Sequence, residues 1–233
     1  MKRLREEGTG TSVDMSANEV MKLRLAVAMK ECIETTPFDA ITVKQICEKS
    51  GTSRQTFYRH FLDKYDLTNW YFDRLLMESF DRMGEGRTVY DGLVRKFTFI
   101  VEERAFFTAA FHNDDQNNLR DHDFHMIYHF YLKRIALWQH YENSSVQRPF
   151  AAVDTWTGRV AAERGLRSVS DDEDAVDEET RELLEMYCNA SIYMTVQWVL
   201  GGMKKSPEEL ARLMIAAMPE RINRIFKAVG LLE

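Results

Sequence analysis

The stretch that decides the fold is Thr42–Phe61, which reads TVKQICEKSGTSRQTFYRHF. Thr42 and Gln45 have the spacing of a capping box, in which two side chains satisfy free amides at the start of a helix. Gly51 follows where the end of a helix often needs a positive φ angle. Ser53 can then cap a second helix. The stretch therefore predicts two short helices joined by a tight turn.

Further helices flank this pair on both sides. Ser16 and Glu19 form another capping box, and they predict a helix that ends before Pro37. Asp63 can cap a helix that continues towards Met83. The sequence thus predicts a compact three-helix unit around the turn, followed by a longer helix.

The rest of the chain also has the pattern of helices. Broad apolar faces predict helices over Thr88–Ala110, Asp121–Tyr141 and Glu178–Leu200. Ser206, followed by proline and two glutamates, is a strong start for a final helix that reaches Val229. The prediction is an all-α protein. It divides into a flexible leader (1–15), an N-terminal unit that contains the two short helices (16–64) and a larger helical domain (65–233).

Composition narrows the class of protein. The 233 residues are 45% hydrophobic and 29% charged, which is typical of a globular chain with a sizeable core. The net charge of −6 argues against a protein that coats nucleic acid or an anionic membrane with its whole surface. The three cysteines lack CxxC spacing, and no secretion signal or apolar run of about 18 residues is present. We therefore expect a cytoplasmic protein outside the membrane.

Two short helices with a glycine turn are the minimum of a helix-turn-helix that reads DNA. Within Phe38–Lys64 there are five basic and three acidic residues, so this segment carries +2 inside an acidic protein. Positive charge is what binding to phosphates requires. The local charge therefore favours a DNA-binding segment over a helix whose amphipathic face is only solvated.

The side chains of this segment suit two tasks. Arg54 and Gln55 lie at the exposed start of the second helix and can donate paired hydrogen bonds to base edges in the major groove. Other side chains suit phosphate oxygens: Thr42, Thr52, Ser53, Thr56, Tyr58, His60 and Lys64. Lys44 and Arg59 complete the predicted DNA-binding set.

On these residues the sequence resembles the TetR family of transcriptional regulators. The resemblance runs from Ile41 to Leu67, and its most telling part is Phe57-Tyr58-Arg59-His60-Phe61 followed by Lys64. It implies phosphate contacts by the residues at Thr42, Thr56, Tyr58, His60 and Lys64. It also implies that Arg54, Gln55 and Arg59 lie at or near the bases. Within the family, the chain could belong to the branch that resembles dihydroxyacetone kinase regulators.

The resemblance further implies a homodimer, built by the last two long helices of each chain. A stripe in the first of these helices has more apolar surface than one internal contact needs: Leu184, Tyr187, Cys188, Ser191, Ile192, Thr195, Trp198 and Val199. The alternative is that these helices only close the core of one chain. A two-fold dimer would bind double-stranded DNA at a near-palindromic operator.

Regulators of this kind carry an effector pocket in the larger domain, and this region is rich in aromatic residues. The candidates for binding an unidentified small-molecule effector are Phe107, Phe111, His125, Tyr128, His129 and Trp138. Ordinary core packing is the alternative for each aromatic residue. His122 shares a helix face with His125 and His129, so a metal or an anionic effector is also conceivable there. Because no further ligands can be named, no metal site and no cofactor are predicted.

The sequence lacks the GxGxxG, GxxxxGK[ST], HExxH and GxSxG patterns of common enzymes, so no catalytic residue is predicted. The leading hypothesis is a ligand-responsive homodimeric repressor. One alternative is a regulator or co-activator that acts through a partner protein. Another is a helical binding protein or enzyme whose helix-turn-helix is architectural.

Overall fold

The computed structural model describes residues 16–80, 87–112, 119–143 and 176–233. Within these ranges the chain forms α-helices and one short 3-10 helix, with no β-strand, so the all-α prediction is confirmed. The predicted leader, 1–15, lies outside the described residues. In chain order the elements are α1 (Ala17–Ile33), η1 (Phe38–Ala40), α2 (Val43–Ser50), α3 (Arg54–His60), α4 (Lys64–Phe80), α5 (Val89–Glu102), α6 (Arg104–His112), α8 (Leu119–Asn143), α10 (Glu178–Leu200), α11 (Pro207–Ala216) and α12 (Glu220–Ala228).

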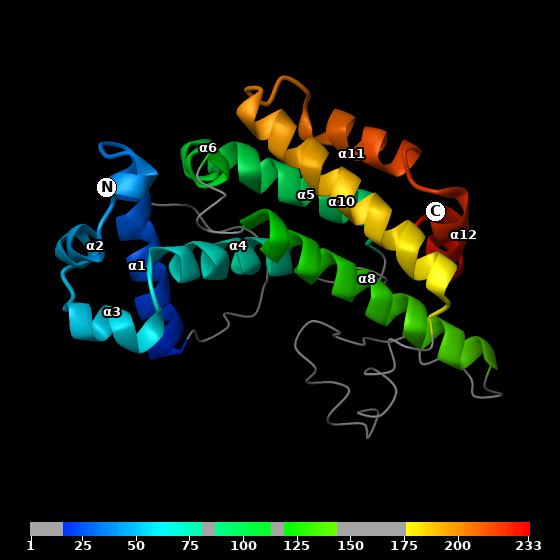
Figure 1. Cartoon of the computed structure of the whole chain (residues 1–233), viewed down its shortest axis with the longest axis horizontal. Coiled ribbons are helices and arrows are strands. Elements are labelled where there is room, and N and C mark those ends of the chain that lie inside the picture. The colour runs from blue at the N-terminus through cyan, green and yellow to red at the C-terminus, as the bar shows by residue number, and fades with distance from the viewer. Residues whose placement is uncertain (1–15, 81–86, 113–118, 144–175) are drawn as a thin grey trace, which may run out of the picture.

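The helices form two groups. Figure 1 shows α1, α2 and α3 as a small unit at the N-terminal end, and α4 reaches from this unit into a larger group made by the remaining helices. In the larger group α5 packs against α4 and α11, and α10 packs against α8 and α6. No helix among the described residues is long and apolar enough to cross a lipid bilayer.

The N-terminal unit (α1–α3) begins its helices where the sequence predicts. Ser16 with Glu19, and Thr42 with Gln45, form the two expected capping boxes. Each box satisfies amides that have no partner within the helix. The core of the unit consists of apolar side chains that are completely buried: Leu25, Met29, Ile46, Phe57 and Leu67. These side chains come from all four of the first α-helices, so α4 belongs to the same core.

The region predicted as one helix, Thr88–Ala110, is instead two helices that meet at Glu103. The backbone of Glu103 has φ −102° and ψ 31°, outside the helical range. Its amide donates to the carbonyl of Phe99 at 2.9 Å, and its carbonyl accepts from the amide of Phe107 at 3.1 Å. One residue therefore ends α5 and starts α6, although neither glycine nor proline marks this corner in the sequence.

The final predicted helix is also divided, into α11 and α12. Pro219 lies between them with φ −54° and ψ 139°. Proline has no amide hydrogen to donate, and it disfavours helical backbone at the residue before it. The sequence therefore carried the signal for this break, and the prediction of one continuous helix was wrong.

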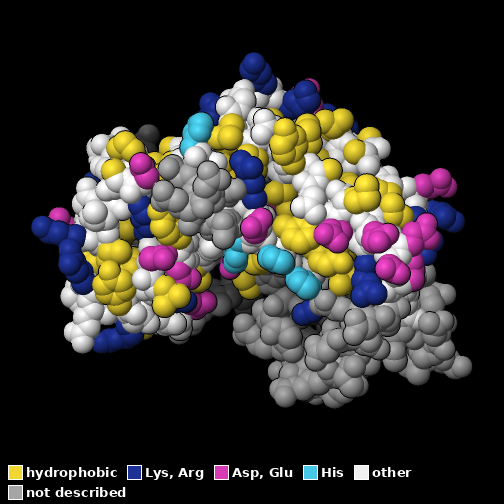
Figure 2. Space-filling view, viewed as in Figure 1, with side chains coloured by type: hydrophobic (Ala, Val, Ile, Leu, Met, Phe, Trp, Pro, Cys, Tyr) yellow, Lys and Arg dark blue, Asp and Glu magenta, His cyan; other side chains and the backbone are white. Residues whose placement is uncertain are grey.

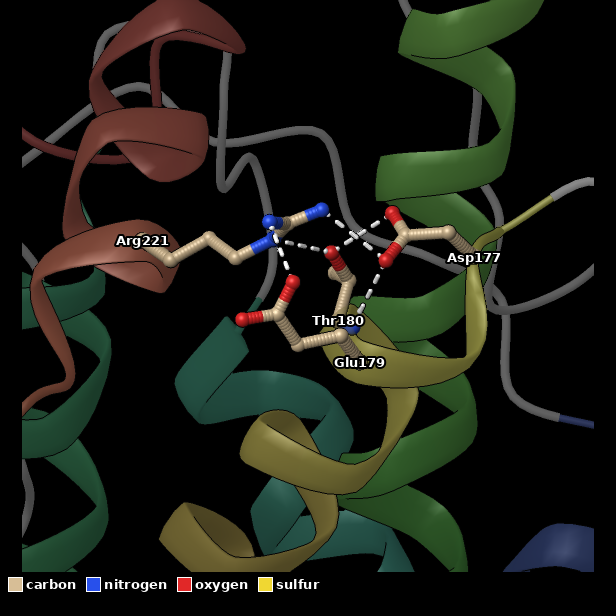
Figure 3. Close-up of polar contacts among 4 residues, drawn as sticks. All are labelled: Asp177, Glu179, Thr180 and Arg221. Atoms are coloured by element: carbon tan, nitrogen blue, oxygen red, sulfur yellow. Dashed lines mark hydrogen bonds and ion pairs between the residues drawn. The ribbon is translucent and has the colours of Figure 1, made fainter.

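Helix α12 is held against the start of α10 by a single guanidinium (Figure 3). Arg221 donates to Asp177, Glu179 and Thr180 at 2.9, 2.7 and 2.8 Å. Asp177 also caps α10, because its carboxylate accepts the amide of Thr180 at 3.0 Å. Burial alone would raise the pKa of Asp177, but the hydrogen bonds from Thr180 and Arg221 lower it below its usual value. The C-terminal helix is thereby fixed to the first turn of α10.

Helix α10 has the predicted bounds, but its apolar stripe has another role than the one expected. Packing within the chain buries seven of the eight side chains, all except half-buried Ser191. Trp198 stacks edge-on against Phe97 with ring centroids 5.5 Å apart, and the Tyr187 hydroxyl donates to the carbonyl of Met214 at 3.2 Å. This corrects the expectation that the stripe faces a second copy of the chain.

Candidate nucleic-acid interface

Helix α3 has one buried and one exposed side. Phe57 is completely buried, and its ring lies 5.9 Å from that of Phe61. The opposite side exposes Arg54, Gln55, Tyr58 and Arg59. The helix is therefore anchored by aromatic packing, and its polar face is free to enter a groove of DNA.

The start of α3 is fixed by hydroxyl groups. Ser53 Oγ accepts a hydrogen bond from the amide of Thr56 at 3.0 Å and lies 2.9 Å from the Thr56 hydroxyl. Thr52 Oγ1 lies 2.8 Å from the hydroxyl of Ser50. Three predicted DNA-binding residues, Thr52, Ser53 and Thr56, thus stabilise the loop before α3 and the first turn of α3. All three lie within two positions of Arg54 in the sequence.

The remaining predicted contacts surround α2 and the end of α3. Thr42 is exposed and caps α2, and Lys44 is exposed with its ammonium 3.7 Å from Glu48. His60 is half-buried at the last position of α3. An exposed lysine-glutamate pair of this kind contributes little to stability, so Lys44 can exchange this partner for a phosphate at small cost.

The turn between α2 and α3 requires glycine. Gly51 has φ 63° and ψ 33°, which confirms the predicted left-handed turn. A β-carbon at this position would also lie 3.1 Å from Nη2 of Arg24 on α1. The conformation and the close approach of α1 therefore both favour a residue without a side chain.

Lys64 has a different environment from the one expected. Its ammonium donates to the carbonyls of Phe38, Asp39 and Ile41 at 2.8, 2.6 and 3.0 Å, and only 8% of the residue is exposed. An ammonium has three hydrogens, so all of them have partners inside the protein. Burial lowers the pKa of Lys64, against the charges of Asp39 and Asp63. In this structure Lys64 ties η1 to the start of α4, which corrects the expectation that it is presented to phosphate.

One polar cluster connects the N-terminal unit to the larger group, and no pattern in the sequence predicts it. Lys30 on α1 is hydrogen-bonded and ion-paired with Glu103, at the corner between α5 and α6. The hydroxyl of Tyr71, on α4, donates to the same carboxylate oxygen at 3.1 Å and lies 3.4 Å from the Lys30 ammonium. These residues are 41 and 73 positions from Lys30 in the chain, so only the tertiary fold brings them together.

The described residues among the six predicted to bind an effector do not share one environment. Phe107 and Phe111 are buried in the core with ring centroids 6.2 Å apart, whereas His125 and His129 are exposed on α8. Tyr128 is half-buried on α8. The side chain of Trp138 lies outside the described part of the structure.

A small cavity of about 20 Å³ lies elsewhere, between α5, α8, α10 and α11. Its polar lining includes Lys96, Ser191 and Thr195, and its apolar lining includes Ile127 and Tyr131. This volume suffices for one water molecule. None of the five described residues predicted to bind an effector lines it.

The structure also separates the three histidines of α8. His122 is bonded to Asp73 on α4, and this hydrogen bond raises the pKa of His122 against the effect of burial. His125 and His129 instead stack on each other with centroids 6.1 Å apart. Among the described residues no three His, Cys, Asp or Glu side chains are grouped so that they could hold a metal ion.

Comparison with known proteins adds to this geometry. The profile of bacterial regulatory proteins of the tetR family matches residues 25–69. Among solved structures the chain is similar to one described as the dihydroxyacetone kinase operon activator DhaS, with 16% identity and a TM-score of 0.49. That similarity covers 92% of this chain and 99% of the other. No curated protein sequence matches the chain.

The matched residues include all of α2 and α3, together with parts of α1 and α4. They are the helices that build the buried core, the glycine turn and the exposed polar face described above. The N-terminal unit is therefore a helix-turn-helix of the tetR family of bacterial regulatory proteins, which supports a DNA-binding regulator of transcription.

Proposed function

We propose that the chain is a cytoplasmic, non-enzymatic repressor that binds a near-palindromic operator as a homodimer and releases it when a small effector binds. In this proposal residues 16–64 bind the DNA, and residues 65–233 carry the dimer surface and the effector site. The observation that carries the proposal is the exposed polar face of α3 on a buried aromatic anchor.

Base recognition is assigned to α3. Arg54 and Gln55 are exposed in its first turn, where a recognition helix presents side chains to base edges. Arginine pairs with guanine and glutamine with adenine through two hydrogen bonds each. Arg59 is exposed on the same helix and, as the resemblance implies, is assigned at or near the bases. Tyr58 and Lys44 are exposed around these residues and suit the phosphates on either side of the groove.

The dimer surface is assigned to the outer face of α10. Met186, Tyr193 and Met194 are exposed there, by 69%, 58% and 42%, and small Ala190 lies between them. Leu213 on α11 is also exposed. Figure 2 shows hydrophobic side chains gathered over α10 and α11 on this side of the molecule, beside a group of carboxylates. Exposed apolar surface of this kind marks an interaction site, and a two-fold dimer would cover it twice.

The effector site is assigned to the small cavity beside Lys96. Ligand pockets for drug-sized molecules measure about 300–1,000 Å³, far more than this cavity offers. An effector must therefore displace side chains from between α5, α8, α10 and α11. Such a displacement changes DNA affinity only if the effector binds the two arrangements of the helices unequally.

The experiment is a DNA-binding titration of the full chain with DNA from upstream of its own gene, at several salt concentrations. We expect one segment to bind more tightly than a scrambled sequence, with affinity that falls steeply as salt rises. Equal affinity for every sequence at every salt concentration would contradict the proposal of a sequence-specific regulator. Footprinting should then show two half-sites related by a two-fold axis.

The dimer is tested separately by sedimentation. Met194→Glu places a charge on the outer face of α10 and should convert a dimer into a monomer. Val101→Glu is the matched control, because Val101 on α5 is 41% exposed and Met194 is 42% exposed. A wild-type monomer, or equal behaviour of the two variants, would contradict the assigned surface.

A further inference from the structure

We infer that Glu103 is a positioning residue for DNA binding. Together with its neighbour Arg104, it holds the N-terminal unit at a fixed place relative to α10 and thereby sets the spacing of the two recognition helices. The inference rests on the proposed homodimer, because spacing is defined only between two copies.

The first half of the connection is the cluster of Glu103, Lys30 and Tyr71. One oxygen of the Glu103 carboxylate, Oε1, is bonded both to the Lys30 ammonium and to the Tyr71 hydroxyl. The side chains of Lys30 and Glu103 are 31% and 20% exposed, so the pair is partly shielded from water. Burial by itself lowers the pKa of Lys30, but the hydrogen bonds with Glu103 and Tyr71 and the charges of both partners together raise it above its ordinary value. The charge that binds α1 to the corner is therefore maintained around neutral pH.

The second half of the connection is Arg104. Its Nη2 donates to the carbonyl of Gly202 at 2.5 Å, directly after the end of α10. The turn that receives this bond is itself well fixed: the amide of Met203 donates to the carbonyl of Trp198 at 2.8 Å, and the Trp198 indole donates to the carbonyl of Lys205 at 2.9 Å. Arg104 is thus hydrogen-bonded to the turn that ends α10, the helix that carries the proposed dimer surface.

These two sets of contacts are made by adjacent residues at the junction of α5 and α6. Glu103 ends α5, and Arg104 begins α6. The next turn of α6 is buried against α4: the ring of Phe106 lies 5.1 Å from that of Tyr71, and the ring of Phe107 lies 5.8 Å from that of Phe72. Because close-packed side chains transmit displacements rather than absorb them, the corner connects α10 to α1 with little freedom.

From α1 the connection reaches the DNA-binding helices directly. Helix α1 packs against α2, and a β-carbon added at Gly51, in the turn before α3, would lie 3.1 Å from Nη2 of Arg24 on α1. In a dimer joined at α10, a tilt of α1 would therefore move both recognition helices. One base pair corresponds to about 3.4 Å along the DNA axis, so a small tilt is enough to change the preferred separation of half-sites.

The test measures operator affinity as a function of half-site spacing. The full chain is titrated with three palindromic operators, built from the footprinted half-site at its natural spacing and at one base pair more and less. A single half-site serves as a fourth DNA. We expect wild type to prefer its natural spacing by about fivefold or more, which is the lower end of typical coupling between sites.

In Glu103→Gln, which keeps the size of the side chain and removes its charge, this preference should shrink towards onefold. Affinity for the single half-site should stay as in wild type. The double variant Lys30→Glu/Glu103→Lys restores an ion pair of reversed polarity and should recover the preference. A loss of stability alone would not change the ratio between spacings, and it would not be repaired by the reversed pair.

The outcomes separate the two proposals. If wild type shows no preference for spacing, the proposal of a DNA-binding homodimer is overturned. If wild type shows the preference and Glu103→Gln retains it in full, the positioning role is overturned while the homodimer stands. Should Glu103→Gln fail to fold, Lys30→Gln removes the other partner of the same bond and carries the same expectation.

Discussion

The Lys96 ammonium lies 2.8 and 2.7 Å from the two carboxylate oxygens of Asp123, and both side chains are shielded from solvent inside the larger group of helices. The pair joins α5 to α8, and the ammonium also lies 5.5 Å from the centre of the Phe72 ring on α4. A buried charge needs such a partner, because transfer from water to a protein interior is costly.

Removing Asp123 should therefore be strongly destabilising. In Asp123→Ala the Lys96 charge stays buried without its counter-ion, and we expect a loss of about 3–5 kcal/mol in the free energy of unfolding. Urea unfolding followed by circular dichroism measures this loss. The double variant Lys96→Met/Asp123→Leu removes both charges and should lose much less. If the free energy of unfolding of Asp123→Ala falls by less than about 1 kcal/mol, the typical effect of one substitution, the buried charge pair is contradicted.

Lys64 should be a residue of stability rather than of salt-dependent binding. Lys64→Met leaves the carbonyls of Phe38, Asp39 and Ile41 without their donor, so we expect a loss of about 1–3 kcal/mol in the free energy of unfolding. The slope of log affinity against log salt should stay as in wild type.

Lys44→Met is the matched control for this prediction, because Lys44 is exposed on α2. It should lower the salt slope by about 0.9, the value for one lost phosphate contact, with little effect on stability. A reversal of the two results, with the slope changed in Lys64→Met, would return Lys64 to the phosphate contacts.

The His122–Asp73 bond should make stability depend on pH. The hydrogen bond to Asp73, with burial acting against it, raises the pKa of His122 above its usual value of about 6.5. The bond therefore contributes its full stability below pH 6.5, and this contribution is lost as pH rises through the raised pKa. Because the two side chains are 30% and 29% exposed, we expect a contribution of at most about 1 kcal/mol.

The measurement compares wild type with His122→Gln at pH 5.5 and pH 8.5 by urea unfolding. The difference in stability between the two proteins should be larger at the lower pH. In an Asp73→Asn background the same substitution should show no such pH dependence. A larger difference at pH 8.5 would contradict the raised pKa.

Arg54 should determine the identity of one base pair. Arg54→Ala is expected to cost about 1–3 kcal/mol on the natural operator and to relax the preference at that position. Competition binding against operators substituted at each position measures both effects. Tyr58→Phe keeps the ring and loses a hydroxyl suited to phosphate, so its smaller loss should be the same for all sequences. An equal loss on every sequence in Arg54→Ala would place Arg54 among the phosphate contacts.

The helix starts of the N-terminal unit could be predicted because each depends on residues a few positions apart. Ser16 with Glu19 and Thr42 with Gln45 form capping boxes in the structure as they do in the sequence, and Gly51 adopts the left-handed conformation expected of it. Pro219 carried an equally local signal, since proline breaks a helix by its own covalent geometry.

The corner at Glu103 had no such signal. Its sequence neighbours favour a continuous helix, and the carboxylate is held by Lys30 and Tyr71, which lie far away in the chain. The same holds for the buried charge of Lys64, for the bond between His122 and Asp73, and for which side of α10 packs inside the chain. Each depends on which helices become neighbours, and helical periodicity alone does not specify the neighbour.

The sequence by itself determined the all-α class and the helix-turn-helix at Thr42–Phe61, which the tetR family model matches, because caps, turns and amphipathic spacing act over a few residues. The tertiary structure alone decided that Lys44 is exposed while Lys64 is buried, which apolar face of α10 remains exposed and how Glu103 and Arg104 connect α1 to α10. These features depend on burial and on contacts across long separations in the chain, and both exist only once the helices have packed.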